Sequence, residues 1–296
     1  MDSKLKLYVP GKLHPQLEFF SNSYFVESNL RQCDVIFYNE FLIGNKNRLF
    51  IQDVQLKRKL RQISAKFSSA GKKVIVLIVF DYEHCYPQLD NLILLRTSMR
   101  ASKKKENEFT VPYLFECKEK AFPLSESTAI PKVGFCGWTR NRRKIMHTFE
   151  QSTEVESNFI KRHRFWGGDP QNQDLVDTFY ENMRENQFNI AQRGAGNFSM
   201  RFYQTLAAGR IPVLVNTDME LPFRSEIPWR DFIVFEDSEK ACVDRVIECH
   251  RQGRIAQMQT TCAEVFRSYL SRTSYFAQLS RRLKEQFLPE TKPYAA

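Results

Sequence analysis

The chain has 296 residues, of which 42% are hydrophobic and 26% are charged, and its formal net charge is +10. These values are typical of a globular protein large enough for two modest domains, and no apolar run approaches the length of a membrane span, so we expect no transmembrane segment. The positive charge is spread over short clusters, which favours anionic ligands such as nucleic acid, a membrane surface or phosphorylated metabolites.

Seven cysteines are scattered along the chain without the pairing or the histidine spacing of a zinc site. We therefore expect free, buried thiols rather than a metal site. Their odd number, together with an N-terminus that does not resemble a signal peptide, favours a reducing compartment. A soluble cytoplasmic protein is the resulting expectation.

The first part of the chain alternates strand and helix patterns. Apolar runs predict strands over 4–9, 33–38 and 74–80, and apolar residues at a helical spacing predict a helix over 55–67. Gly71 is the expected cap at the end of this helix. This order of elements predicts a parallel sheet in a protein of the α/β class.

Carboxylates follow two of these strands. Asp81 and Glu83 come after the strand at 74–80, and Glu40 comes after the strand at 33–38. Ligands of open α/β sheets bind beyond the carboxyl ends of the strands, where such a side chain can act as a general base. The competing interpretation is that Asp81 caps a turn in a solvated loop.

The best linker candidate is the stretch 122–131, which is rich in Ser, Thr and Pro. It predicts an N-terminal domain over 1–125 and a second α/β domain over 126–273. The last helix and tail, 274–296, are expected to pack back on the first domain. The basic run at 103–105 is interpreted as a solvated loop.

The second domain is expected to open with a strand at 133–136 that runs into Gly137 and then Arg140. A strand followed by a glycine and by a cation at a helix start can hold an anion. A surface arginine on an exposed turn gives the same pattern, so both interpretations stay open. An amphipathic helix is expected over 174–186.

The most informative stretch is 188–216. It combines a short apolar strand, a glycine-containing basic turn and the start of a helix, with candidate anion ligands at Arg193, Gly194, Gly196, Ser199 and Arg201. Glycines let the backbone approach a phosphate, a helix start presents free N–H groups, and arginines add charge-assisted hydrogen bonds. An ordinary structural turn between a strand and a helix is the competing interpretation.

Several short motifs occur in an order that resembles the C-terminal signature of the exostosin family of glycosyltransferases. They are Arg-Gly at 193–194, Ser-x-Arg-Phe at 199–202, Gly-x-Ile-Pro-Val at 209–213, Leu-Pro-Phe at 221–223, and Trp229 before an apolar strand. Their order and intervals are far more specific than one glycine motif. The resemblance covers the second half of the chain well and the first half thinly.

This resemblance implies two Rossmann-like domains that face a cleft, the GT-B type of glycosyltransferase. It implies an inverting enzyme that moves a sugar from a UDP-sugar to a glycan hydroxyl by direct displacement. UDP-xylose is the leading donor, followed by UDP-glucuronate, UDP-galactose and UDP-N-acetylglucosamine. Members without an anchor are known from bacteria and large algal viruses, so a cytoplasmic enzyme is expected, in the host cell if the protein is viral.

The resemblance also assigns roles to residues. Asp81 is the expected catalytic base, with Glu83 and Glu40 in reserve. Arg193→Ala is expected to abolish transfer and weaken UDP binding while leaving the fold intact. The expected donor-binding residues are Arg193, Gly194, Gly196, Ser199, Arg201, Arg140, Gly137, Asn216, Trp229 and Glu236.

The chain departs from the family pattern at Gln204, where many exostosin-like sequences have an acidic residue. Glu236 is therefore considered as an alternative ligand for hydroxyl groups. No essential cofactor or metal is expected. The pairs Asp81–Glu83 and Asp218–Glu220 superficially resemble Mn²⁺-binding motifs, but cationic strand ends already serve the phosphates.

Two other functions stay open at this stage. The net charge and the basic clusters at 57–59 and 103–105 suggest a nucleic-acid-binding protein. The interleaved aromatic and basic pattern of a single-strand platform is missing, so we expect no nucleic-acid partner. The other function is that of an inactive relative that binds sugar without transferring it.

Overall fold

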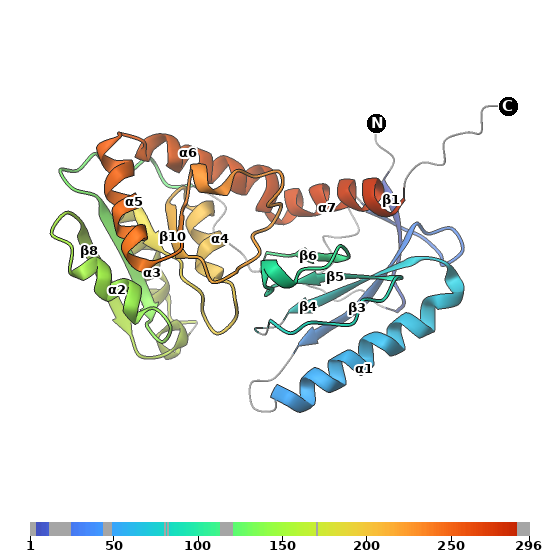
Figure 1. Ribbon diagram of the computed structural model, residues 1–296. Helices are drawn as coiled ribbons and strands as arrows, with labels where there is room; N and C mark the ends of the chain where they lie inside the picture. Colours follow the sequence, from blue (N-terminus) through green and yellow to red (C-terminus); the bar gives the residue numbers. More distant parts are fainter. Residues whose placement is uncertain are drawn as a thin grey trace. The chain divides into compact units, whose positions relative to one another are not determined.

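The computed structural model describes residues 4–11, 25–43, 49–79, 81, 83–112, 121–169 and 171–288. The chain forms two compact units, and each contains a parallel β-sheet with helices (Figure 1). The predicted class, α/β with two Rossmann-like domains, is therefore confirmed. The first unit comprises Met1–Met99, Lys103–Leu114 and Arg272–Ala296, and the second comprises Arg100–Ser102 and Phe115–Ser271.

The first unit is built on a six-stranded sheet in the order β2-β1-β3-β4-β5-β6, with every neighbouring pair parallel. Strand β4 has the sequence KVIVLIV and is buried along its centre, which is typical of a parallel sheet. Helix α1 contributes Leu60, Ile63 and Phe67 to the same core cluster as β4. The elements are β1 (Leu5–Tyr8), β2 (Phe25–Glu27), β3 (Val35–Ile43), α1 (Leu49–Phe67), β4 (Lys73–Val79), β5 (Leu92–Arg96), β6 (Glu108–Thr110) and α7 (Arg272–Phe287).

The second unit has a five-stranded parallel sheet in the order β11-β10-β9-β7-β8. Helix α3 approaches β7 closely because Gly134 has no side chain: a Cβ there would lie 2.7 Å from Nδ2 of the buried Asn186. The elements are β7 (Lys132–Trp138), α2 (Arg143–Glu150), β8 (Glu156–Arg162), α3 (Gln173–Glu185), β9 (Phe188–Ile190), α4 (Met200–Ala207), β10 (Ile211–Val215), β11 (Val234–Glu236), α5 (Glu239–Arg251) and α6 (Ile255–Val265).

One predicted strand end is wrong. The strand expected over 33–38 continues to Ile43, because its apolar run resumes after a short polar interruption. The pairing of β3 with β4 shifts between Tyr38 and Leu42, which is a bulge-like irregularity, and then continues. Glu40 therefore lies within β3 instead of beyond its end, and its side chain is outside the described residues.

The last described helix, α7, belongs to the first unit although it follows the second unit in the sequence. The Tyr275 hydroxyl donates a hydrogen bond to the carbonyl of Thr110, 3.0 Å away, and Nε2 of Gln286 donates to the carbonyl of Glu106, also at 3.0 Å. Phe276, Leu279 and other residues of α7 are buried. The helix thus completes the core of a unit whose sheet is encoded much earlier.

Candidate functional site

Two turns of the second unit are tied together at the carboxyl ends of β7 and β9, which are neighbours in its sheet. Nε of Arg142 donates to the carbonyl of Gln192 and Nη1 donates to the carbonyl of Trp138, both at 3.0 Å. Nδ2 of Asn141 donates to the carbonyl of Gly194 at 2.7 Å. The sequence therefore places its polar turns at the edge where ligands of α/β sheets bind.

Arg201 lies in the first turn of α4 and points back to the end of β7. Its Nη2 donates to the carbonyl of Cys136 at 2.6 Å, and the guanidinium carbon lies 4.3 Å from the ring centre of Phe135 and 5.4 Å from that of Phe179. The nitrogens Nε and Nη1 are buried and have no hydrogen-bond partner. Buried N–H groups of this kind normally find an acceptor, so the site is incomplete without one.

Three cations gather around this position: Arg142, Arg162 and Arg201, which we call the arginine cluster. Burial, together with the positive charges of Arg142 and Arg162, lowers the pKa of Arg201 to about 9. Burial alone lowers the pKa of Arg142 to about 10. No carboxylate in the described part of the chain pairs with Arg201. A bound anion would therefore offset both the cost of burying its charge and the repulsion from Arg142 and Arg162.

Gly137, one of the predicted ligand-binding residues, makes room for this arginine. Its φ is 147°, and a Cβ at this position would lie 2.6 Å from Nη2 of Arg201. A side chain would therefore displace the guanidinium as well as strain the backbone. Gly137 lies inside β7, next to its last residue, and not after the strand as expected; the close approach of a cation explains a glycine there, and its direct contact with a ligand stays a prediction.

The turn before α4 is held by its own hydrogen bonds. The Gly194 amide donates to the carbonyl of Phe198 at 3.1 Å, and neither Gly194 nor Gly196 has a positive φ. Ser199 is buried and does not cap the helix with its side chain, while Arg193 is half-buried. In the structure this turn lies beside the arginine cluster, and the binding roles of its residues stay predictions.

Arg142 and Arg162 are the members of the arginine cluster that the sequence prediction did not name. Arg142 stands in the run Arg140-Asn141-Arg142-Arg143 at the start of α2, where spacing alone does not tell which cation points inward. The structure leaves Arg140 exposed over the ring of Trp138, with 5.3 Å between the guanidinium carbon and the ring centre. Arg142 instead turns back under the sheet edge and contacts the turn at 192–194.

Three other predicted residues lie near the ends of β10 and β11. Asn216 follows β10, and its Nδ2 donates to Oδ1 of Asp237 at 2.9 Å. Trp229 is only 4% exposed, donates its indole N–H to the carbonyl of Pro222 at 3.0 Å and packs against Phe202. This burial favours a role in the core over a direct contact with a ligand.

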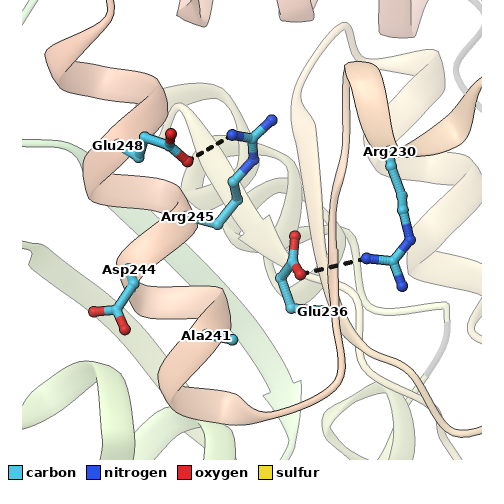
Figure 2. Close-up of a pocket in the computed structure, with 6 residues that line it drawn as sticks. All are labelled: Arg230, Glu236, Ala241, Asp244, Arg245 and Glu248. Atoms are coloured by element: carbon cyan, nitrogen blue, oxygen red, sulfur yellow. Dashed lines mark hydrogen bonds and ion pairs between the residues drawn. The ribbon is translucent and has the colours of Figure 1, made fainter.

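Glu236 ends β11 and lines an open pocket of about 520 Å³ in the second unit. Figure 2 shows that charged side chains from α5 and from the end of β11 surround this hollow. They pair with one another: Arg245 donates to Glu248 at 2.6 Å, and Arg230 lies 3.4 Å from Glu236. Asp244, the remaining charged residue of the lining, pairs with Lys240, so each of these charges has a partner, unlike Arg201, and Glu236 stays a candidate ligand for hydroxyl groups.

Two of the three predicted catalytic residues lie just after β4, while Glu40 lies within β3. Asp81 and Glu83 are half-buried, and the carbonyl of Asp81 accepts a hydrogen bond from the Ser98 hydroxyl at 3.4 Å. The described residues contain no cluster of His, Cys, Asp and Glu that could hold a metal ion. The prediction that no metal is essential stays a prediction. None of the helices in the described ranges is long and apolar enough to cross a membrane.

The fold and this site define a Rossmann-like α/β protein with a buried cationic centre at the carboxyl edge of its second sheet. Residues 123–245, which lie in that second unit, match the family model of the Exostosin GT47 domain. Over these residues the chain is therefore similar to the exostosin family of glycosyltransferases, and the predicted resemblance is confirmed there.

Similar curated proteins are plant enzymes. A probable glucuronosyltransferase of rice, Oryza sativa subsp. japonica, is 37% identical over 62 residues, which are 21% of this chain and 14% of the rice protein. A probable β-1,4-xylosyltransferase of Arabidopsis thaliana is also 37% identical over 62 residues, 21% of this chain and 15% of the plant protein. The matched stretch thus spans less than a fifth of each of these two relatives.

Two solved structures show a distant likeness to this chain. TarM of S. aureus, crystallised with UDP, has a TM-score of 0.44 at 8% identity, covering 71% of this chain and 50% of TarM. The lipopolysaccharide outer core galactosyltransferase WaaB has a TM-score of 0.47 at 9% identity, covering 96% of this chain and 99% of WaaB. At such low scores the likeness is too distant to indicate a shared ligand or mechanism.

Proposed function

We propose that the protein is an inverting glycosyltransferase of the GT-B type that uses a UDP-sugar, and that the arginine cluster binds the diphosphate of the donor. The observation that carries this proposal is Arg201, a buried guanidinium with two nitrogens that lack an acceptor, beside two further arginines. Burial of unpaired charge is costly, and an anion that binds at such a site offsets this cost.

The chemistry of sugar transfer suits such a centre. The oxygen of an acceptor hydroxyl forms a bond to C1 of the sugar, the bond between C1 and the diphosphate oxygen breaks, and UDP leaves with the electron pair. The charge that develops on the leaving diphosphate is stabilised by preorganised cations in a water-poor site. Arg201 and Arg142 are held by backbone carbonyls and stacked on Phe135, so little reorganisation is needed.

The acceptor hydroxyl must lose a proton in the same step, and we assign this task to Asp81, with Glu83 as the alternative. Both follow the carboxyl end of β4, where an α/β unit places its functional groups. The proton passes to the carboxylate as the new glycosidic bond forms. A single displacement of this kind inverts the configuration at C1.

UDP-xylose stays the leading proposal for the donor, with UDP-glucuronate next to it. The relatives named above support this pair, because one is a probable xylosyltransferase and the other a probable glucuronosyltransferase. The acceptor is proposed to be a glycan hydroxyl.

The proposal is tested by titrating the protein with UDP, GDP and a single-stranded DNA oligonucleotide in a calorimeter, and by screening the hydrolysis of several UDP-sugars in EDTA and in Mn²⁺. Selective binding of UDP with turnover of at least one UDP-sugar is expected. Binding of the oligonucleotide in preference to UDP would replace this function with nucleic-acid binding. UDP binding without turnover of any sugar would indicate an inactive relative, and turnover only with Mn²⁺ would contradict metal independence.

The affinity for UDP is expected to fall at alkaline pH. The pKa of Arg201 is about 9 in the free protein, and a bound diphosphate stabilises the charged form and raises that pKa. Binding therefore takes up a proton above pH 9, and the dissociation constant should rise by about tenfold for each pH unit above that value. Calorimetric titrations between pH 8 and pH 10 measure this slope.

Uracil also loses a proton in the alkaline range, so the control is Arg201→Met titrated over the same pH values. This variant keeps the titration of the ligand and lacks that of the guanidinium. Its slope should be shallower than that of the unaltered protein. Equal slopes would mean that Arg201 does not titrate with binding.

A further inference from the structure

The first unit contains a buried arginine, Arg96, whose contacts converge on the loop that follows β4. Arg96, the last residue of β5, is 3% exposed, and its Nη1 donates to Oε1 of Glu108 at 2.7 Å. Glu108, the first residue of β6, is 1% exposed. The pair thus joins neighbouring strands at the sheet edge where Asp81 and Glu83 follow β4.

The other side of the Arg96 guanidinium holds the loop directly. Its Nη2 donates to the carbonyl of His84 at 2.7 Å, and its central carbon lies 4.5 Å from the ring centre of Tyr86. Lys105 adds a second tether, because its Nζ donates to the carbonyl of Tyr86 while its backbone N–H donates to the Glu108 carboxylate at 3.1 Å. Residues 83–86 are therefore fixed by both backbone and side-chain contacts.

Core stability does not explain such a pair. A buried arginine and glutamate lose their hydration, and a well-packed apolar pair of similar volume commonly serves a core as well or better. What an apolar pair lacks is direction: a planar guanidinium can donate to a carboxylate and a carbonyl at fixed angles while it stacks on an aromatic ring. The Arg96–Glu108 pair therefore fixes the position and orientation of the loop at 83–86.

We propose that Arg96 is a positioning residue for the reaction: with Glu108 as its anchor, it holds the loop at 83–86 so that the carboxylate beside it removes the acceptor proton in the correct geometry. This inference rests on the proposed glycosyl transfer. Arg96 does not contact the reacting atoms; it acts through His84, Tyr86 and the short segment that carries Glu83 and Asp81.

The test uses Arg96→Lys. This variant keeps the positive charge beside Glu108 but loses the hydrogen bond to the carbonyl of His84 and the stacking on Tyr86. Hydrogen exchange followed by mass spectrometry should show faster exchange for the amides of 83–86. Transfer should lose kcat by at least about tenfold, since small misplacements of a catalytic group cost this much or more. The dissociation constant for UDP, whose site lies in the second unit, should change by less than about twofold.

A matched control is Arg210→Lys in the second unit. Arg210 is 2% exposed and also donates to backbone carbonyls, those of Arg184 and Pro123, but it is not a ligand of either proposed site. This variant should leave both kcat and the exchange of 83–86 unchanged. Tyr86→Leu removes the stacking surface, while Arg96 keeps its partner Glu108. The same exchange and kcat measurements are made on this variant if Arg96→Lys does not fold.

The outcomes separate this inference from the proposed function. If the unaltered protein neither binds UDP nor turns over a UDP-sugar, the function is wrong, whatever the exchange experiment shows. Unchanged hydrogen exchange at 83–86 in both Arg96→Lys and Tyr86→Leu would show that Arg96 does not hold this loop, even if the enzyme is active. Faster exchange with unchanged kcat overturns the positioning role.

Discussion

Replacing Arg201 by methionine is expected to reduce the affinity for UDP by at least about a hundredfold and, at the same time, to raise the thermal stability of the free protein. The loss of affinity follows because a buried charged partner of the diphosphate is removed, which costs about 2–5 kcal/mol in comparable pairs. The methionine side chain still packs on Phe135 and Phe179. Few ligand-site variants are expected to move binding and stability in opposite directions.

The gain in stability comes from the unpaired charge. The pKa of Arg201 is about 9 in the folded protein, well below the ordinary value of an arginine, so at neutral pH folding disfavours the charged form. Methionine removes that cost and gives up one hydrogen bond to Cys136, for a net gain of about 1 kcal/mol in the free energy of unfolding. Calorimetry gives the affinity, and thermal unfolding without ligand gives the stability.

Arg251→Met is the control, because Arg251 is exposed and pairs with Glu154 on the surface of the same unit. It removes the same charge from the unit and should leave UDP binding nearly unchanged. A lower melting temperature for Arg201→Met, combined with intact UDP binding, would show that this arginine is a structural cation and not a ligand.

Replacing Asp81 by asparagine is expected to lower kcat for transfer by about 10²–10⁴, the usual contribution of a general base, without weakening UDP binding. Asparagine has nearly the same shape, and Asp81 is half-buried, so the fold should be unaffected. Steady-state transfer assays and UDP calorimetry on the same preparation measure the two quantities.

Glu83→Gln is the matched variant for this experiment. It changes a neighbouring half-buried carboxylate in the same loop and should reduce kcat by much less. A large loss in Glu83→Gln with a small loss in Asp81→Asn would exchange the two assignments. Equal, small losses in both would place the base outside this loop.

The sequence predicted the region 188–216 closely because its signals are local. Apolar runs mark β9 and β10, and Gly209 follows α4 with a φ of 64°, the conformation expected of a glycine after a helix end. Ser238 accepts a hydrogen bond from the amide of Ala241 at the start of α5, as a serine at an N-cap does. Such features depend on a few neighbouring residues and can be read without the fold.

The arginine cluster could not be derived in the same way. Arg201 is stacked between Phe135 and Phe179, which lie more than twenty positions away on other elements. Only the packed structure distinguishes Arg142, which turns inward, from Arg140, which stays at the surface. The tether from Arg96 to His84 is equally non-local, because it depends on two parallel strands meeting at one edge.

Helix α7 has a consequence for how the protein is made. The sheet of the first unit is complete by Thr110, but the helix that packs Tyr275 against it emerges from the ribosome only after the whole second unit. The second unit is continuous apart from Arg100–Ser102 and can fold while its successor is still being translated. The first unit must wait, with part of its apolar surface uncovered, so it is the part of the nascent chain that most needs protection by chaperones.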